Sequence, residues 1–188
     1  MNAKLFNTLT PEKIDGSPEI KLWLEQFSLL DQVIGKILLS RLRFVSISTY
    51  QNWLVRELDA LNRDTKFALY AVRKLEQGEE SFFYDNGEPL DRPSESQGSE
   101  DLVNSLIANY VKDKGDVFYD HPSVNILRDN QIRALILIED SIGSGRRISD
   151  FINAILKNRT IRSWWSFGWL QIKIFSFSRV KETENKII

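Results

Sequence analysis

Apolar residues recur every three or four positions through the first third of the chain, which is the spacing of an amphipathic helix. The residues that follow this spacing are Leu22, Trp23, Phe27, Leu30, Val33, Ile34, Ile37, Leu38, Leu42, Trp53, Leu54, Leu58 and Leu61. The β-branched stretch 44–50 interrupts the pattern as a turn, where Ser48 or Thr49 is placed to cap the next helix. We therefore predict that residues 1–62 form an N-terminal extension of two or three helices.

The remaining residues, 63–188, alternate short apolar runs with helical patterns. Continuous apolar or β-branched runs predict strands at 67–72, 134–138 and 170–177, and shorter strands at 82–84 and 117–119. Helical spacing predicts helices at 99–111 and 146–157, while 85–98 and 115–130 are predicted as irregular loops. Because strands alternate with helices, this part of the chain favours an α/β domain with a mostly parallel central sheet flanked by helices.

Composition narrows the classes of function. The chain has 25 basic and 26 acidic residues, so no whole-chain field attracts nucleic acid or an anionic membrane, and such contacts would have to be local. The absence of cysteine excludes disulfides, thiolate catalysis and cysteine-ligated metals. The N-terminus lacks a secretion signal and no apolar run has the length of a membrane span, so we expect a cytoplasmic protein without a membrane partner.

The segment 134–148 carries the candidate chemistry, because a buried strand runs into two acids, a small-residue turn and a helix. Ligands of α/β sheets bind at the carboxyl ends of strands, and a helix N-terminus attracts anions. Glycines let the backbone approach a phosphate, and a serine hydroxyl donates to it. Two carboxylates suit sugar hydroxyls and Mg²⁺, bound directly or through water. The predicted phosphate-binding residues are Ile142, Gly143, Ser144, Gly145, Arg146 and Arg147, with Glu139 and Asp140 facing the sugar and the metal.

Other phosphate motifs fit this segment less well. A Walker loop requires lysine and then Ser or Thr after its second glycine, where this chain has Arg146 and Arg147. A dinucleotide fingerprint requires a third glycine, which is missing after Gly145. An ordinary strand-to-helix connection with solvated charges remains an alternative.

The segment resembles the signature of type I phosphoribosyltransferases, in which an apolar strand leads into two acids and a short hydroxyl- and glycine-containing loop. The resemblance implies that Glu139 and Asp140 are the ribose-binding, catalytic acids and that 142–145 is the phosphate loop. Arg147 stands in the place of the family's final Ser or Thr. Gly98, Ser99 and Glu100 match a candidate pyrophosphate loop, although they also have the pattern of a plain helix start. The interval 112–130 corresponds to the family's mobile flap.

With its helical N-terminal part, the chain is most similar to the divergent phosphoribosyltransferase-like proteins of bacterial conflict and antiphage systems. This similarity implies a phosphoribosyl diphosphate or nucleotide ligand, Mg²⁺ as cofactor, and a protein partner from a defence system. No further strand or base-recognising hood is evident after Ser178, so the domain is expected to be incomplete at its C-terminus and the acceptor base is not readable.

A second hypothesis is a non-catalytic module that senses a nucleotide or binds a partner. It depends on the aromatic stretch 159–169, where three tryptophans lie near arginines. Such rings can stack on bases or form a protein interface, and packing against the sheet is the simpler interpretation. His121, the only histidine, is expected at the surface.

Overall fold

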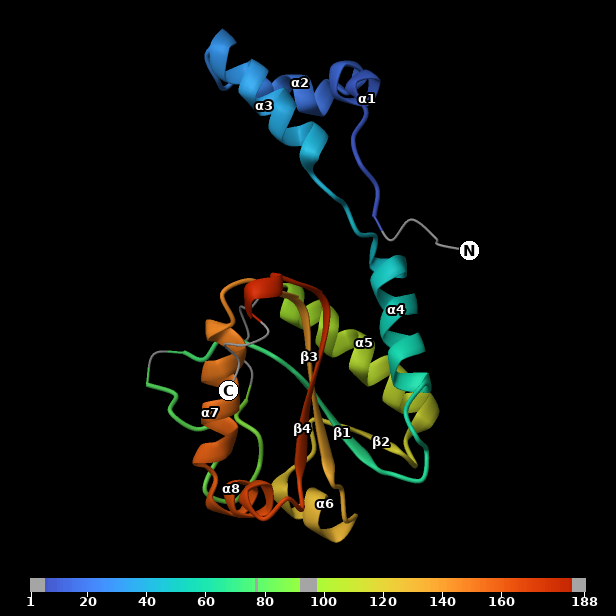
Figure 1. Ribbon diagram of the computed structural model, residues 1–188, viewed down its shortest axis with the longest axis vertical. Helices are drawn as coiled ribbons and strands as arrows, with labels where there is room; N and C mark the ends of the chain where they lie inside the picture. Colours follow the sequence, from blue (N-terminus) through green and yellow to red (C-terminus); the bar gives the residue numbers. More distant parts are fainter. Residues whose placement is uncertain (1–5, 77, 92–97, 184–188) are drawn as a thin grey trace. The chain divides into compact units, whose positions relative to one another are not determined.

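The computed structural model describes residues 6–76, 78–91 and 98–183. The chain divides into two compact units, Met1–Arg56 and Glu57–Ile188, with the boundary inside a helix (Figure 1). The sequence pattern placed this boundary six residues later, after residue 62.

The first unit contains the helices α1 (Pro11–Gly16), α2 (Pro18–Leu24) and α3 (Leu29–Arg41), and most of α4 (Ile47–Asp59). The first three begin after Thr10, Ser17 and Ser28, whose side chains accept a hydrogen bond from a backbone N–H of the first turn. For α4, the cap is Ser46, whose Oγ accepts from the N–H of Thr49 at 3.1 Å. The prediction of Ser48 or Thr49 as cap is wrong because the helix begins before them, at Ile47.

The second unit is built on four strands, β1 (Phe67–Ala71), β2 (Phe118–Asp120), β3 (Ala134–Ile142) and β4 (Gln171–Arg179). They form one sheet in the order β2-β1-β3-β4, and all three neighbouring pairs are parallel. β1 and β3 are almost entirely buried, which explains their continuous apolar sequences. The predicted α/β class with a parallel central sheet is confirmed.

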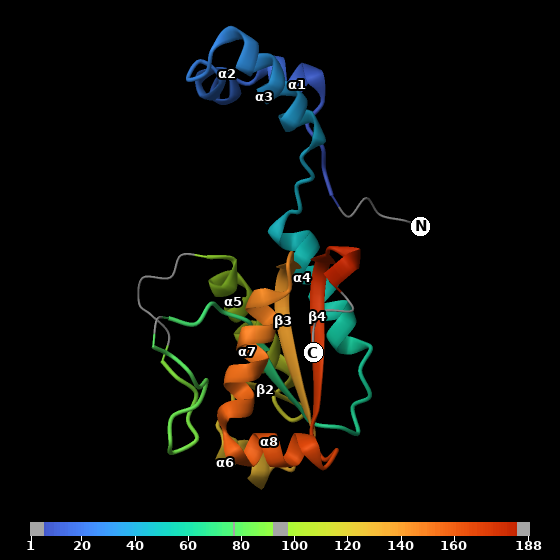
Figure 2. The ribbon, with the colours of Figure 1, turned by 60° about the vertical axis from the view of Figure 1, so that its left-hand side comes forward.

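Helices cover both faces of this sheet (Figure 2). One face packs against α7 (Arg146–Lys157), where Leu135 and Leu137 of β3 meet Ile148 and Phe151. The other face packs against α5 (Ser99–Lys114), which contacts β1, β2 and β3. Because successive side chains of a strand point to opposite faces, β3 supplies apolar residues to both layers.

The largest differences from the sequence prediction concern four elements of this unit. β3 continues four residues past the predicted end, since β4 runs beside it as far as Arg179 and supplies hydrogen-bond partners. Residues 82–84 form only an isolated bridge from Phe83 to Pro89. Two short helices, α6 (Val124–Asp129) and α8 (Arg159–Ser166), were not predicted. They begin at side-chain caps, Ser123 and Asn158, a local signal that the apolar spacing alone did not reveal.

The strand β4 is followed by a single 3₁₀ turn, η1 (Lys181–Thr183). Among the helices that the structure describes, none combines the length and the apolar character that crossing a membrane requires.

Candidate functional site

A pocket of about 220 Å³ lies where β3 passes into α7, at the carboxyl edge of the sheet. Parallel α/β sheets bind ligands at this edge. The residues that line the pocket are Glu139, Ser141, Ile142, Gly143, Ser144, Gly145, Arg147 and Ile148. The structure therefore brings together six of the eight residues predicted for phosphate and sugar binding; Asp140 and Arg146 do not line it.

The loop between β3 and α7 is reduced to Gly143, Ser144 and Gly145, because β3 extends through Ile142. Gly145 stands at the N-cap of α7 with φ 82°, a left-handed conformation that side chains rarely adopt. This conformation lets the chain turn at once from strand into helix. The backbone N–H groups of the first turn of α7 have no partner within the helix, so the loop and helix end together offer donors to the pocket.

Residues at the end of β4 and just after it hold the end of β3 and the loop in place. The Thr183 hydroxyl, on a side chain that is buried, donates to the carbonyl oxygen of Gly143 at 2.5 Å. The N–H of Val180 donates to the carbonyl of Ile142 at 3.0 Å, and the Ser178 hydroxyl donates to that of Ser141 at 3.0 Å. Sequence reasoning missed Thr183, since it lies forty positions from Gly143 and no local pattern relates them.

Glu139 is the buried charge of the site, with only 4% of its surface exposed. Its Oε1 accepts hydrogen bonds from the guanidinium of Arg147, while its Oε2 has no hydrogen-bond partner among the described residues. Burial raises the pKa of the Glu139 carboxyl above its ordinary value, and the charge of Asp140 adds to this rise; Arg147 opposes it. A buried carboxylate oxygen without a donor is costly, so the pocket favours a ligand that supplies one.

Asp140 was expected to face the sugar beside Glu139. Both acids lie inside β3, where consecutive side chains point to opposite faces, and the side chain of Asp140 is partly exposed. Its Oδ1 lies 3.9 Å from the guanidinium of Arg147, which connects the two acids. Arg147 is therefore hydrogen-bonded to Glu139 and lies within ion-pair distance of Asp140.

The predicted pyrophosphate residues have the position of a helix start. Gly98 is the N-cap of α5 and its N–H donates to the Asp101 carboxylate at 3.3 Å, while Ser99 and Glu100 are the first helical residues. Residues 92–97, which belong to the same predicted loop, lie outside the described residues. Gly98, Ser99 and Glu100 do not line the pocket at Gly145.

A second polar pair lies at the carboxyl end of β2. His121 has φ 42°, its Nε2 accepts from the N–H of Ala71 at 2.9 Å, and its Nδ1 pairs with Asp120. The side chain is largely buried, so the expectation of a plain surface histidine is wrong. Its position two residues after the predicted strand 117–119 is the signal that could have placed it at the sheet edge. β1 separates this pair from β3, so the two strand ends lie on the order of 10 Å apart.

The carboxylates of Glu139 and Asp140 can coordinate Mg²⁺ only if water and a bound ligand supply the remaining oxygen atoms. No group of three or more metal-ligating side chains gathers anywhere in the part of the chain that the structure describes. One Glu139 oxygen is bonded to Arg147, which leaves Oε2 and the partly exposed Asp140 as donors. Mg²⁺ commonly uses one or two carboxylates, several waters and substrate phosphates, so this donor set suits it.

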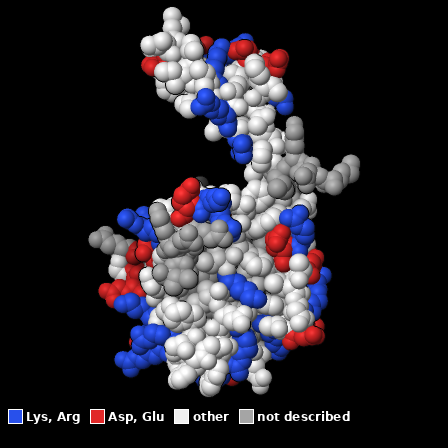
Figure 3. Space-filling view, in the orientation of Figure 1, with Lys and Arg blue, Asp and Glu red and all other residues white. Residues whose placement is uncertain are grey.

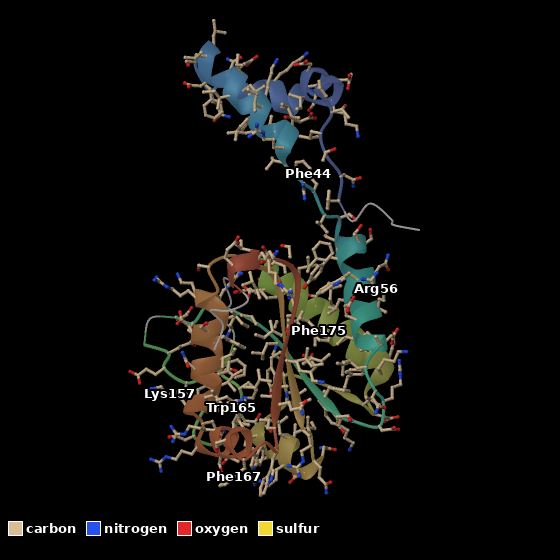
Figure 4. All side chains as sticks on the ribbon, viewed as in Figure 1. Phe44, Arg56, Lys157, Trp165, Phe167 and Phe175 are labelled. Atoms are coloured by element: carbon tan, nitrogen blue, oxygen red, sulfur yellow. The ribbon has the colours of Figure 1, made fainter. Side chains whose placement is uncertain are left out.

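The aromatic stretch is divided between core and surface. Trp164 packs against the core, whereas Trp165, Phe167 and Trp169 are exposed on α8 and the turn after it, at the amino end of β4 (Figure 4). This edge of the sheet is opposite the pocket. The interpretation as simple packing therefore holds for Trp164 alone.

We expect Arg147→Met to destabilise the protein by about 1–3 kcal/mol at pH 7.5, because it leaves a buried carboxylate without its cation. Removing Arg147 also raises the pKa of Glu139 further. An acid with a raised pKa in the folded state contributes stability at low pH that is lost as pH rises through that pKa. The loss relative to the parent should therefore be small at pH 4 and grow toward pH 7.5.

Urea unfolding at both pH values measures this difference, with Arg146→Met, the exposed neighbour, as control. An equal loss at pH 4 and pH 7.5 would show that the Arg147 side chain acts by packing and not by charge.

Comparisons of the chain with protein-family models, with curated proteins and with solved structures found no match.

Proposed function

We propose that the pocket between β3 and α7 binds a phosphorylated ribose, such as phosphoribosyl diphosphate or a nucleotide, together with Mg²⁺. One observation carries this proposal: the pocket is lined by a donor-rich loop and by Glu139, a buried acid whose Oε2 has no hydrogen-bond partner among the described residues. The backbone N–H groups of the loop are suited to bind an anion, and the unpaired oxygen of Glu139 is suited to accept a hydrogen bond from a hydroxyl group. A sugar phosphate provides both groups within one small molecule.

Each part of the site has a defined task in this proposal. The backbone of Gly143 to Arg147 binds the phosphate at the amino end of α7, and the Ser144 hydroxyl adds a donor. Glu139 accepts from a ribose hydroxyl. Arg147, already bonded to Glu139 and close to Asp140, holds the carboxylates in position and offers positive charge to the ligand. Bound Mg²⁺ would neutralise diphosphate charge, with Glu139 and Asp140 holding it directly or through water.

The two acids are also the proposed catalytic residues. When the bond from the anomeric carbon to a leaving diphosphate breaks, positive charge develops on the sugar. Carboxylates fixed beside the ring stabilise that charge. The buried, hydrogen-bonded Glu139 is oriented for this task before the ligand arrives.

Titration calorimetry tests the proposal with the parent protein, phosphoribosyl diphosphate and Mg²⁺, in parallel with ribose 5-phosphate, ribose and inorganic phosphate. We expect binding of the two phosphorylated sugars and none of ribose alone. Chelation of Mg²⁺ should weaken the diphosphate more than the monophosphate. Absence of binding by every phosphorylated sugar would refute the function.

Asp140→Asn is expected to weaken Mg²⁺-dependent binding of phosphoribosyl diphosphate by about tenfold or more while the fold is retained, since loss of a charge-assisted contact costs on the order of 1.5–3 kcal/mol. The matched control is Asp150→Asn, an exposed residue of α7 outside the pocket. Calorimetry with metal present measures both variants. Equal affinity in Asp140→Asn and the parent would remove Asp140 from the site.

A second function, binding of a partner without catalysis, is favoured by the exposed rings of Trp165, Phe167 and Trp169. An assay of pyrophosphate release, with and without nucleobases, separates it from transferase activity. The resemblance carries the wider proposal that the protein and a partner act in antiphage defence. Infection assays with the parent and with a loop variant deficient in ligand binding test that role.

A further inference from the structure

The helix α3 carries its apolar face outward. Positions 32, 35 and 39, which face α1 and α2, are glutamine, glycine and leucine. The residues of the opposite face are Leu30, Val33, Ile34, Ile37 and Leu38, which are between 48% and 76% exposed. We call these five residues the α3 stripe. Their spacing is that of the buried face of a packed helix.

Contacts inside the first unit establish this orientation. Gly35 lies so close to α2 that a Cβ there would stand 2.9 Å from a methyl group of Leu24. Lys36 is ion-paired with Asp15 at 2.7 Å, on the side of α1. The stripe therefore cannot turn inward without breaking the packing of α3 on α1 and α2.

The stripe is part of a larger apolar surface that is exposed to solvent. Of the large apolar residues described in α1, α2 and α3, only Ile14 and Leu24 are buried. Trp23 and Phe27, whose rings contact each other, are also exposed. Figure 3 shows uncharged residues over much of this unit, with acidic and basic side chains between them. Contiguous apolar patches of this kind mark protein interfaces.

We propose that the α3 stripe pairs with the same stripe of a second copy of this chain, with the two helices antiparallel. The stripe is nearly symmetric about the point midway between residues 35 and 36, so an antiparallel alignment sets Ile34 against Ile37 and Val33 against Leu38. A two-fold interface requires such self-complementarity. The thirteen residues of α3 span about 20 Å, and Phe27 and Leu42 extend the contact at each end.

The charges at the two ends of α3 favour an antiparallel arrangement, and they favour a second copy of the chain as the partner of the α3 stripe. Asp31 lies in the first turn of α3 and Arg41 in the last. The antiparallel alignment places the first turn of each copy, with Asp31, beside the last turn of the other, with Arg41, which gives two opposite-charge pairs. A parallel pair would instead place like charges side by side, which is unfavourable.

Sedimentation velocity of the full chain, from low to high micromolar concentration, tests the proposal. We expect a dimer that Ile34→Glu converts to a monomer with unchanged helix content by circular dichroism. Ile126→Glu, which changes an exposed apolar residue of α6 in the second unit, is the control and should leave the dimer intact.

A charge exchange distinguishes an interface from a structural role. Asp31→Arg should weaken the dimer at least tenfold, and the double variant Asp31→Arg/Arg41→Asp should restore it. Both exchanged charges oppose the helix dipole, so a structural role would make the double variant worse than the single one. If Ile34→Glu fails to fold, the single and double charge variants still test whether the α3 stripe forms the dimer.

A parent protein that stays monomeric, a dimer insensitive to Ile34→Glu, or a double variant weaker than the single one would overturn the proposal. The stripe would then belong to an interface with a different protein.

Discussion

Gly145→Val is expected to abolish binding of phosphoribosyl ligands, with a loss on the order of a hundredfold or more. Gly145 has φ 82° at the N-cap of α7, and a β-branched residue strongly disfavours this conformation. Relief of that strain moves the loop out of line with the first turn of the helix. Loss of two charge-assisted hydrogen bonds to phosphate costs about 3–6 kcal/mol, which corresponds to the stated loss.

Gly168→Val provides a matched control for Gly145→Val. Gly168 also has positive φ, 71°, and no atom lies within 4 Å of the position its Cβ would take. It stands between α8 and β4, outside the pocket. Both variants should melt at a lower temperature than the parent, but only Gly145→Val should lose binding in calorimetry. Retained binding by a folded Gly145→Val protein would make the loop a simple connector.

Phe151→Ala is expected to destabilise the protein by about 3–5 kcal/mol, the usual cost of removing a fully buried aromatic ring. The side chain of Phe151 is 0% exposed, and the centroid of its ring lies 4.9 Å from that of Phe82. This contact joins α7 to the segment after β1. Because Phe151 and Ile148 join the same core, the variant should also loosen the attachment of α7 to the sheet.

The same substitution at an exposed ring, Phe167→Ala, controls for the chemical change. Phe167 is 71% exposed, so its loss should alter the free energy of unfolding by less than about 0.5 kcal/mol. Denaturant unfolding followed by circular dichroism measures both variants. A small loss for Phe151→Ala would mean that the core closes over the missing ring.

Prediction from the sequence succeeded where the residues of a single helix or strand determine its type and its bounds. The helix α7 was predicted with its observed bounds, Arg146–Lys157, because the glycine turn ends at Gly145 and helical apolar spacing begins at Ile148. The strand before it was predicted too short, since Glu139 to Ile142 have no apolar run and are held in the sheet by β4. The six candidate residues that line the pocket lie together because strand, loop and helix are adjacent in sequence.

Contacts between distant segments were not predictable in this way. The pairing of Glu139 with Arg147 depends on the extension of β3, which brings the Glu139 carboxylate to the first turn of α7. The hydrogen bond from Thr183 to Gly143 joins residues brought together only when β4 lies beside β3. His121 gains its bond to Ala71 in the same manner, from the order of the strands.

The sequence by itself determined the α/β class of the second unit, the helical nature of the first, and the loop from Gly143 to Gly145, because apolar spacing and glycine act over a few residues. Tertiary structure alone decided which charges are buried and which apolar residues are exposed. The leucines and isoleucines of α3 have the spacing of a core helix, yet they lie outside because Gly35 fits against Leu24. Burial depends on what packs against a face, and that partner lies far away in the sequence or on another molecule.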